Sequence, residues 1–419
     1  MSNNLYEKIA NLYGNDENEC KYQRDRFNRI INLYSKYFNE QDKISILSTP
    51  GRTELSGNHT DHNGGKVIAA SISLDTIACA SKQDELVEIY SEGFNDPFVV
   101  NLSDLKKCDS ESGTTSALIR GIAAALSERG YKIGGFKCVI SSDVTMGSGL
   151  SSSASVEIMI ASLFNHFYNS DSIPPLLLAQ IGQYSENIYF EKPCGLMDQV
   201  ACATGGIVTI DFFDSDNPKI EKINFSLSDY GYKLLVLDTG GTHHNLTEDY
   251  AAIPEEMKSV AKLFDKNICS EIDFNLFIKN RNKLRGAVSD RAILRAFHFF
   301  NENKRVEQQV LALKNDDLDT FLRLVNRSGD SSYKYLQNLY SPNNVAEQPL
   351  SLALAFTGSF LESKKCGASR VHGGGFAGTI QVFLPNEFVE EYIEFMEPIF
   401  GRNSVTVLNI RPYGTFVLS

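Results

Sequence analysis

The sequence of 419 residues contains no Cys-x-x-Cys pair, no apolar run near the length of about 20 residues that spans a membrane, and no excess of basic side chains. Its eight scattered cysteines predict neither a zinc module nor a disulfide framework, and we expect buried, reduced thiols. Lys and Arg number 40 against 52 Asp and Glu, which gives a net charge of −12. This sign disfavours broad attraction to nucleic acid or to an anionic membrane, so any phosphate must be bound locally.

What is present is the composition of a folded globular protein. Hydrophobic residues make up 42% and charged residues 22%, both close to globular averages, and the length suggests two or three domains. The N-terminus is polar and acidic, without the basic and apolar regions of a signal peptide. We therefore expect a cytoplasmic protein, and as its oligomeric state we predict a monomer.

Helical and extended patterns are mixed along the chain without a strict strand-helix-strand rhythm. Apolar residues at helical spacing predict helices over 6–38 and 117–126, and Ile- and Val-rich stretches predict strands over 44–47, 67–80 and 86–90. This mixture favours the α+β class, with mixed or antiparallel sheets covered by helices.

A stretch rich in Asp, Ser, Asn and Pro over 211–219 interrupts the pattern and predicts a domain boundary. We expect one domain over 1–213 and a second over 214–419. The second begins with a predicted strand at 233–238 and is largely helical over 250–340.

A glycine- and serine-rich loop over 143–155 lies between a predicted strand and a predicted helix. Such a loop offers unpaired N–H groups and the positive end of a helix dipole to an anion, which predicts a phosphate site. It is neither a Walker loop, because no Gly-Lys-Ser/Thr follows, nor a Rossmann loop, because Ser152 replaces the third glycine. An ordinary helix capped by serine is the alternative. Because a helix end supplies only about half an elementary charge, a bound triphosphate requires a metal, and carboxylate and hydroxyl ligands suit magnesium.

A polar cluster over 50–65 places donors and acceptors between glycines after the first predicted strand. A loop of this kind suits a polyol, whose hydroxyls take bidentate carboxylate and amide partners. A metal held by His59 and His62 is disfavoured by their spacing and context, and a solvated turn is the plainer alternative.

Four segments carry a resemblance to known kinases. Residues 50–65 are similar to the galactokinase signature Gly-Arg-x-Asn-Leu-Ile-Gly-Glu-His-Thr-Asp-Tyr-Asn-x-Gly, and residues 143–155 resemble the second motif of the GHMP small-molecule kinases. Residues 194–199 resemble the Cys-Gly-Ile-Met-Asp-Gln motif that is specific to galactokinases, and residues 371–378 resemble the late glycine-rich motif of the wider GHMP superfamily. The four occur in the family's order over most of the chain. The resemblance implies a two-lobed GHMP-kinase-like fold with the active site in the cleft between the lobes.

The resemblance also implies an activity and its residues. The activity is ATP-dependent phosphorylation of galactose at the anomeric hydroxyl, giving galactose 1-phosphate and ADP, with ATP and Mg²⁺ bound. Asp198 would take or orient the proton, while Arg52 would stabilise the developing charge. The implied substrate contacts are Asn58, His59, Asp61, Gly195 and Tyr250; the ATP-binding positions are Gly147, Ser148, Gly149, Leu150, Ser151, Ser152 and Ser153; and the metal ligands are Ser153 and Glu186.

The residues by themselves leave other roles open. Asp198 could cap a helix, Arg52 could be a solvated surface charge, and Tyr250 could be a core side chain. The chain also departs from the signature, because Asn58 replaces the usual glutamate and His62 the usual tyrosine. With no tryptophan, any aromatic platform for the purine must be built from Tyr or Phe.

Two alternative functions therefore stand beside a galactokinase. One is a 1-kinase for another hexose such as N-acetylgalactosamine, motivated by Asn58. The other is a catalytically silent sensor of galactose and ATP, which the intact Ser152-Ser153-Ala154 and Asp198 disfavour. In each case we expect the protein to bind a small-molecule sugar, and to bind neither nucleic acid nor a membrane.

Overall fold

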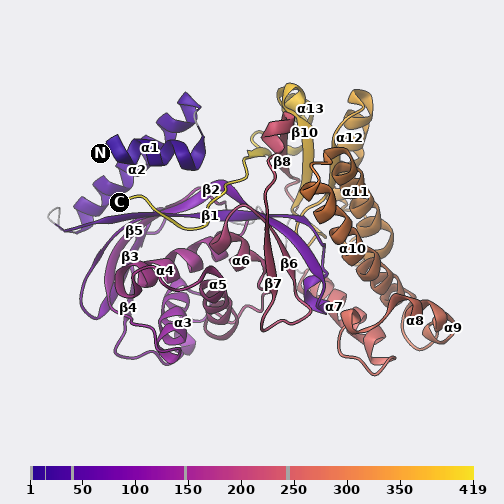
Figure 1. Ribbon diagram of the computed structural model, residues 1–419, viewed down its shortest axis with the longest axis horizontal. Helices are drawn as coiled ribbons and strands as arrows, with labels where there is room; N and C mark the ends of the chain where they lie inside the picture. The colour runs from indigo at the N-terminus through magenta and orange to yellow at the C-terminus, as the bar shows by residue number, and fades with distance from the viewer. Residues whose placement is uncertain (1–2, 15, 39–41, 146–148, 242–245) are drawn as a thin grey trace.

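The computed structural model describes residues 3–14, 16–38, 42–145, 149–241 and 246–419. The chain forms two halves that lie side by side, each built around one β-sheet (Figure 1). The larger sheet has eight strands in the order β12-β1-β2-β5-β3-β4, with β6 and β7 attached through β2. The smaller sheet has four strands in the order β11-β8-β10-β9.

Both sheets are mainly antiparallel. The strands of the larger sheet are β1 (Ser45–Ser56), β2 (Lys66–Lys82), β3 (Leu86–Ser91), β4 (Phe98–Asn101), β5 (Phe136–Ser142), β6 (Ile207–Asp211), β7 (Lys219–Ile223) and β12 (Phe416–Val417). Those of the smaller sheet are β8 (Tyr232–Asp238), β9 (Ala368–Val371), β10 (Thr379–Pro385) and β11 (Val405–Leu408). Only β3 and β5 pair in parallel among the strands of the described ranges. The prediction of mixed and antiparallel sheets is confirmed.

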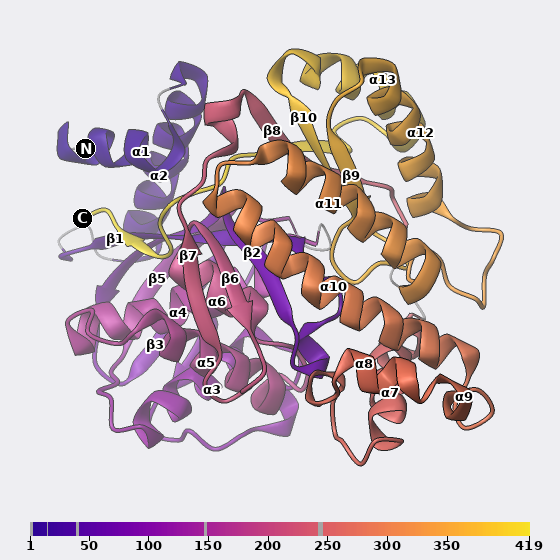
Figure 2. The same ribbon diagram turned by 45° about the vertical axis from the view of Figure 1, so that its right-hand side comes forward.

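Helices cover both faces of the larger sheet (Figures 1 and 2). One face carries α1 (Asn3–Tyr13) and α2 (Glu17–Tyr37); the other carries α3 (Thr115–Glu128), α4 (Ser152–Asn169), α5 (Pro175–Tyr184) and α6 (Met197–Thr204). Successive side chains of a strand point to opposite faces, so each strand serves both cores. In β2, Ile77 and Cys79 pack with α1 and α2, whereas Ala78 and Ala80 pack with α3 and α4.

The smaller sheet also lies between helices. The helices of this half are α7 (Thr247–Lys262), α8 (Phe274–Lys279), α9 (Arg281–Leu284), α10 (Asp290–Lys314), α11 (Leu318–Ser331), α12 (Pro349–Lys364) and α13 (Val389–Phe400). Side chains of α12 and α13 pack on Leu235 and Leu237 of β8, while α10 and α11 pack on Leu234 and Val236. The core of α10 and α11 also includes Leu55 of β1, so it joins the two halves.

The predicted α+β class and two-lobed shape are confirmed, with one correction at the first strand. The sequence predicted a loop from Pro50, but β1 continues through Pro50 and Gly51 to Ser56. The pairing of β1 with β2 shifts register between Pro50 and Arg52, and such an irregularity tolerates a proline, which has no N–H to donate. Arg52 therefore lies on a strand.

The predicted boundary between residues 213 and 214 lies in the turn that joins β6 to β7. These strands pair from Ile207 opposite Ile223 to Asp211 opposite Lys219, so both belong to the larger sheet. The chain end also returns there, because β12 pairs with β1. We propose that the first domain extends to Ile223 and includes the terminal strand β12.

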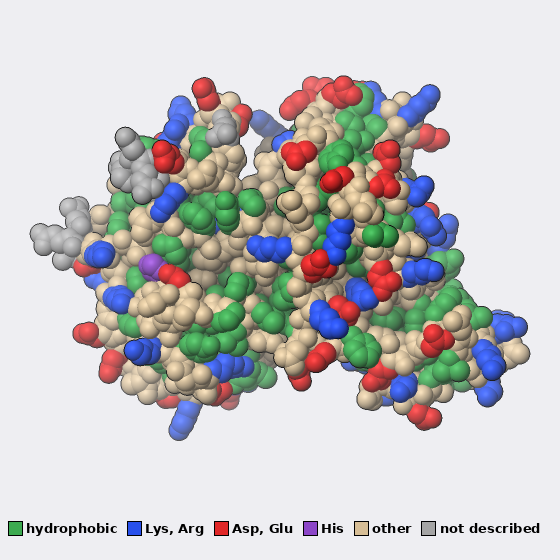
Figure 3. Space-filling model, viewed as in Figure 1, with side chains coloured by type: hydrophobic (Ala, Val, Ile, Leu, Met, Phe, Trp, Pro, Cys, Tyr) green, Lys and Arg blue, Asp and Glu red, His purple; other side chains and the backbone are tan. Residues whose placement is uncertain are grey.

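The distribution of surface charge and the state of the cysteines agree with what the composition predicts. In the view of Figure 3, basic and acidic side chains are interspersed, and a notch separates the N-terminal helices from α13. Among the described helices, none combines the length and the apolar composition needed to cross a membrane. All eight cysteines are unpaired, as predicted, although only four are buried and Cys108 is exposed.

Candidate active site

A cavity of about 220 Å³ lies where β1, the segment before α6 and the loop before β10 meet. Arg52 and Glu54 of β1 line it, as do the loop after β1, residues from 193 to 198, and Gly373 with Gly374. Three of the four sequence motifs thus meet at one pocket. A larger cavity, about 920 Å³, lies beside the β7–β8 connection, and none of the predicted site residues that the structure describes lines it.

Arg52 and Asp198 form a bidentate ion pair at the wall of this pocket. Arg52 Nε lies 2.7 Å from Asp198 Oδ1, and Nη2 lies 2.6 Å from Oδ2. Arg52 is only 8% exposed, so it is not a solvated surface charge. Asp198 is the second residue of α6, and the N-cap of this helix is Leu196. Asp198 therefore does not cap the helix, and its paired carboxylate lines the pocket.

The Asp198 carboxyl is held in its charged form. Burial by itself would raise its pKa, but the charge and hydrogen bonds of Arg52 and the hydroxyl of Ser151 outweigh burial, so the pKa lies below its ordinary value. The side chain of Asp198 is 30% exposed. A substrate in the pocket therefore meets an ionised carboxylate.

The described part of the phosphate loop contacts the same pair. The Gly149 carbonyl accepts a hydrogen bond from Arg52 Nη1, the Leu150 carbonyl accepts one from Arg52 N at 3.0 Å, and the Ser151 hydroxyl donates to Asp198 Oδ2. Ser151 is the N-cap of α4 but makes no capping hydrogen bond, so it does not play the ordinary capping role. Ser152 and Ser153 begin α4, while Gly147 and Ser148 lie outside the described residues.

His59, Asp61 and Gly195, which the sequence predicts to contact the sugar, line the pocket, and their role as sugar contacts stays a prediction. His59 Nε2 donates to the Gly374 carbonyl at 2.8 Å, and burial lowers the His59 pKa to about 4, so the ring is neutral near pH 7. A Cβ at position 195 would lie 2.7 Å from Asp61 Oδ2, so a larger residue here would displace the Asp61 carboxylate. His62 lines the pocket as well.

Asn58 and Tyr250 do not line this pocket. Asn58 is fully buried. Its side-chain Nδ2 donates to the Gly373 carbonyl, and its Oδ1 accepts a hydrogen bond from Asn338 Nδ2. The Tyr250 hydroxyl donates to the Gly375 carbonyl at 2.8 Å, and its ring packs edge-on against Phe376. Their predicted roles as sugar contacts stay predictions.

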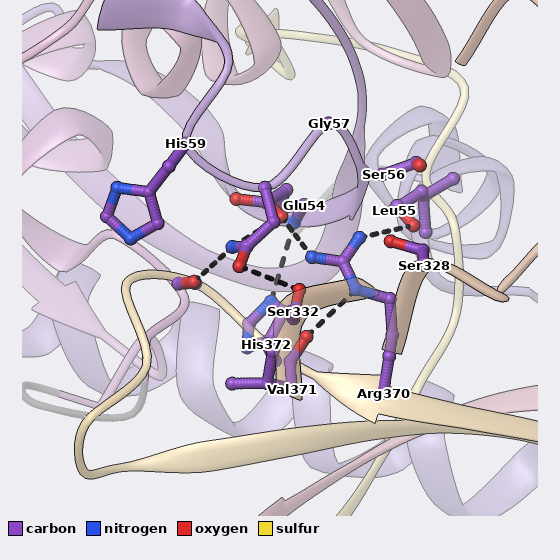
Figure 4. A network of polar contacts seen from close by, with 12 residues as sticks. Glu54, Leu55, Ser56, Gly57, His59, Ser328, Ser332, Arg370, Val371 and His372 are labelled. Atoms are coloured by element: carbon purple, nitrogen blue, oxygen red, sulfur yellow. Dashed lines mark hydrogen bonds and ion pairs between the residues drawn. The ribbon is translucent and has the colours of Figure 1, made fainter. Parts of the chain in front are cut away.

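Glu54 is a pocket residue that the sequence reasoning missed. Figure 4 shows its carboxylate beside the guanidinium of Arg370, which β9 supplies from the other half. The signal was present in the signature itself, which has asparagine at this position and glutamate at position 58. In this chain the two residue types are exchanged.

The predicted metal ligands lie on α4 and on the π-helical turn η3 (Ser185–Tyr189) after α5. The Ser153 hydroxyl makes no hydrogen bond with any described residue. One turn along α4 lies Glu157, on the same helix face. Gln199 Nε2 donates to Glu157 Oε2 at 2.9 Å and to Glu186 Oε2 at 3.1 Å, and so joins the two carboxylates.

The chemistry of these side chains fits magnesium. Glu186 Oε1 accepts from Lys192 Nζ at 2.9 Å, while Glu157 Oε1 and Gln199 Oε1 are buried without a partner among the residues that the structure describes. A free hydroxyl and a carboxylate are oxygen ligands of the kind that Mg²⁺ prefers. Within the described ranges, no three His, Cys, Asp or Glu side chains gather as a metal site. The protein can therefore supply only part of a coordination sphere, as is usual for Mg²⁺ bound with phosphates and water.

Comparison with known proteins gives the same family throughout. Residues 32–82 match the galactokinase galactose-binding signature, and residues 117–206 match the GHMP kinases N terminal domain. A galactokinase of Clostridium acetobutylicum is 29% identical over 399 residues, 91% of this chain and 97% of that protein. A galactokinase of Pyrococcus furiosus is 34% identical over 279 residues, 66% of this chain and 74% of that protein.

Solved structures show the same fold. Lactococcus lactis galactokinase complexed with galactose superimposes with a TM-score of 0.80 at 23% identity, over 93% of this chain and 99% of that one. Methanococcus jannaschii mevalonate kinase reaches 0.60 at 18% identity, over 87% of this chain and 98% of that one. The predicted GHMP-kinase-like fold is thus confirmed, and the chain belongs to the galactokinase family.

Proposed function

We propose that this protein is an ATP-dependent galactokinase, which transfers the γ-phosphoryl group of ATP to the anomeric hydroxyl of galactose. One observation carries the assignment. The Arg52–Asp198 ion pair forms part of a small polar pocket and is contacted directly by Ser151, at the start of the helix that the phosphate loop enters. A sugar in this pocket therefore lies next to phosphates bound at that loop.

Asp198 receives the proton in this mechanism. As the anomeric oxygen forms its bond to the γ-phosphorus, its proton passes to the Asp198 carboxylate, and the bond from the γ-phosphorus to the bridging oxygen of ADP breaks. Arg52 faces both Asp198 and the loop, so its charge can stabilise the transferring phosphoryl group. Because phosphoryl transfer requires little covalent chemistry from the protein, positioning and electrostatics account for most of the rate.

The loop and the start of α4 would hold the ATP phosphates. Ser151 to Ser153 lie at the N-terminal end of an 18-residue helix, where backbone N–H groups and the helix dipole favour negative charge. Ser153 and Glu186 would hold Mg²⁺, which neutralises charge on the phosphates when it is bound. The hydroxyl of Ser153 makes no hydrogen bond with any residue in the described parts of the chain, so it is available for this role.

The other candidate functions gain no specific support. A kinase for a larger hexose was suggested by Asn58, but its amide is occupied by protein groups and lies outside the pocket lining. A silent sensor would not need the charged Asp198 that Arg52 and Ser151 hold in place. The monomeric state and the cytoplasmic location stay predictions.

The test is an ADP-release assay with galactose, other hexoses and the variant Asp198→Asn. We expect galactose to be the preferred substrate and the variant to lose a factor of about 10² to 10⁴ in turnover, because general base catalysis contributes about that much. The variant should still fold, although its unfolding midpoint should fall because Arg52 loses its charge partner. Asp96→Asn, an exposed carboxylate in the turn between β3 and β4, is the matched control and should retain full activity.

Two outcomes would contradict the proposal. A parent protein that releases no ADP with any hexose, yet binds galactose and ATP, would be a sensor. A folded Asp198→Asn protein with nearly normal turnover would remove the assigned role from this carboxylate.

A further inference from the structure

Glu54 presents a carboxylate oxygen at the sugar pocket that has no partner in the described parts of the chain. The residue is 5% exposed and lies on β1 among the pocket-lining side chains. Its Oε1 atom accepts from Arg370 Nη2 at 2.5 Å and from Asn58 Nδ2 at 3.3 Å. Its Oε2 atom accepts no hydrogen bond from any described residue, yet it is not among the fully enclosed atoms that lack a partner. Oε2 is therefore open to a donor from the pocket.

Asn58 is in the opposite situation. Its Nδ2 donates to the Gly373 carbonyl at 2.6 Å as well as to Glu54, and its Oδ1 accepts from Asn338 Nδ2 at 2.8 Å and from Ser332 at 3.2 Å. Asn58 is fully buried in a network that ties β1 to the other half of the molecule. Its polar atoms are thus committed to the protein, and the role of an acceptor at the pocket falls to Glu54.

The position of Glu54 along β1 indicates which part of a sugar it would meet. Arg52, Thr53 and Glu54 pair with consecutive residues of β2, so the strand is regular here, and Arg52 and Glu54 point to the same face. Two residues of a strand span about 6.6 Å. If the anomeric hydroxyl lies at Arg52 and Asp198, the opposite end of a pyranose ring, around C4, is directed toward Glu54.

We propose that Glu54 is a specificity-determining residue, whose Oε2 accepts a hydrogen bond from a hydroxyl at the C4 end of the sugar ring. The inference deepens the proposed function and rests on it. Galactose and glucose differ only in whether the C4 hydroxyl is axial or equatorial, so a fixed acceptor at this end separates the two epimers. Arg370 holds the carboxylate in place, since Arg370 is fully buried and also donates to the Leu55 and Val371 carbonyls (Figure 4).

The variant Glu54→Gln tests this directly. Both neighbours of Oε1 are donors, so the new amide would turn its oxygen toward Arg370 and Asn58 and its NH₂ group toward the pocket. The substitution thus keeps the shape of the side chain but replaces an acceptor at the pocket with a donor. Glu54→Asp is the second variant, because it keeps a charge for Arg370 while withdrawing the carboxylate from the sugar.

The experiment measures galactose binding by calorimetry for the parent, both variants and Ser332→Ala. Ser332 belongs to the same network but does not line the pocket, so its variant should keep the parent's affinity within about twofold. We expect Glu54→Gln and Glu54→Asp to bind galactose about 10 to 100 times more weakly, since a hydrogen bond to a charged group is lost. ATP binding should be unchanged in all three.

Deoxy sugars show which sugar hydroxyl Glu54 contacts. Because they are also measured on the parent protein, the test stays valid if a variant is unstable. We expect 4-deoxygalactose or 6-deoxygalactose to bind the parent more weakly than galactose, and the Glu54 variants to lose that discrimination. Folded Glu54 variants with the parent's galactose affinity and epimer preference would overturn the inference, as would equal binding of galactose and all its deoxy analogues by the parent. The proposed function is tested separately by the activity assay. A parent protein that does not phosphorylate galactose would contradict that function, whatever the calorimetry shows for Glu54.

Discussion

At the scale of single residues, the proposed site is organised around one charge pair that joins the sugar pocket to the glycine- and serine-rich loop. Arg52 donates to Asp198 on one side and to the Gly149 carbonyl of that loop on the other. The same guanidinium therefore keeps Asp198 ionised and lies beside the loop proposed to bind the nucleotide. This arrangement explains why a buried arginine is tolerated here, because its donors are paired within the protein before any substrate enters.

The metal ligands give a prediction at the same scale. Glu186→Gln should raise the Mg²⁺ concentration needed for half-maximal activity by at least about tenfold, because even changes to groups that only orient a metal ligand cost about 10- to 100-fold. A magnesium titration of ADP release measures this. Glu191→Gln is the control, since the Glu191 side chain is half exposed and pairs with Lys107. Equal magnesium requirements for the two variants would remove Glu186 from the metal site.

At the scale of elements, the close contact between β1 and the phosphate loop determines where the loop lies. A Cβ on Gly51 would lie 2.9 Å from the Leu150 carbonyl and 3.0 Å from Val144. The adjacent hydrogen bond from Arg52 N to the Leu150 carbonyl requires this approach. Glycine at position 51 thus allows the strand carrying Arg52 to touch the loop.

Gly51→Ala should therefore displace the loop from β1. We expect a higher KM for ATP and a lower kcat, by about tenfold or more in kcat/KM, because small misplacements of catalytic groups are costly. Steady-state kinetics with ATP as the varied substrate check this. Gly358→Ala, at an exposed position of α12 with nothing near its Cβ, should leave the kinetics unchanged and slightly raise stability. Parent-like kinetics for Gly51→Ala would show that the contact is not needed.

At the scale of the whole molecule, both ends of the chain converge on Asp75 of β2. Arg26 of α2 lies 2.5 Å from Asp75 Oδ1, and Arg411 near the C-terminus lies 3.1 Å from Oδ2, with all three side chains fully buried. Arg26 also lies 3.1 Å from Asp143, just before the phosphate loop. The N-terminal helices are thus tied into the first half next to the nucleotide side of the site.

Removing one partner of this cluster should be costly. Arg26→Ala should lower the free energy of unfolding by about 3 to 5 kcal/mol, since it removes the nearer of the two cations that pair with the buried Asp75 carboxylate. Arg29→Ala is the matched control on the same helix, where a half-exposed ion pair with Glu92 should contribute about 0 to 1 kcal/mol. Urea unfolding of the two variants measures the difference. Equal losses would contradict the role of the buried cluster.

Stability should also fall in mild acid. Burial lowers the pKa of His59 to about 4 and those of His298 and His372 to about 3, whereas unfolded histidine has a pKa of about 6.5. Between these values the unfolded chain binds protons that the folded protein does not, so the free energy of unfolding decreases as pH falls. Each histidine contributes up to about 1.4 kcal/mol per pH unit.

Glu157 acts in the opposite direction, because burial and then the charge of Glu186 raise its pKa. Burial also raises the pKa of Asp143, but three histidines against two carboxyls still leave a net loss of stability. Urea unfolding near neutral pH and at about pH 5 tests the sign. His298→Gln should flatten the dependence, and a free energy of unfolding that does not change over this range would contradict the prediction.

The sequence by itself determined the positions of several helices and strands, the family and the identities of five pocket residues. Helical and strand spacing is a local property, and the four motifs name side chains whose chemistry does not depend on their neighbours. Arg52, His59, Asp61, Gly195 and Asp198 were all identified in this way, and all line one pocket.

Only the tertiary structure decided which neighbouring polar residue faces the sugar and which supports the fold. Glu54 and Asn58 are four residues apart in one motif, but β1 continues past Pro50 to Ser56, so the pleat directs Glu54 to the pocket, while Asn58, just after the strand, lies in the network with Asn338. Likewise, Arg52 and Asp198 are 146 residues apart along the chain, and only the packing of α6 against β1 places their charges in contact. The direction of a side chain depends on strand register and on distant partners, and spacing along the chain carries neither.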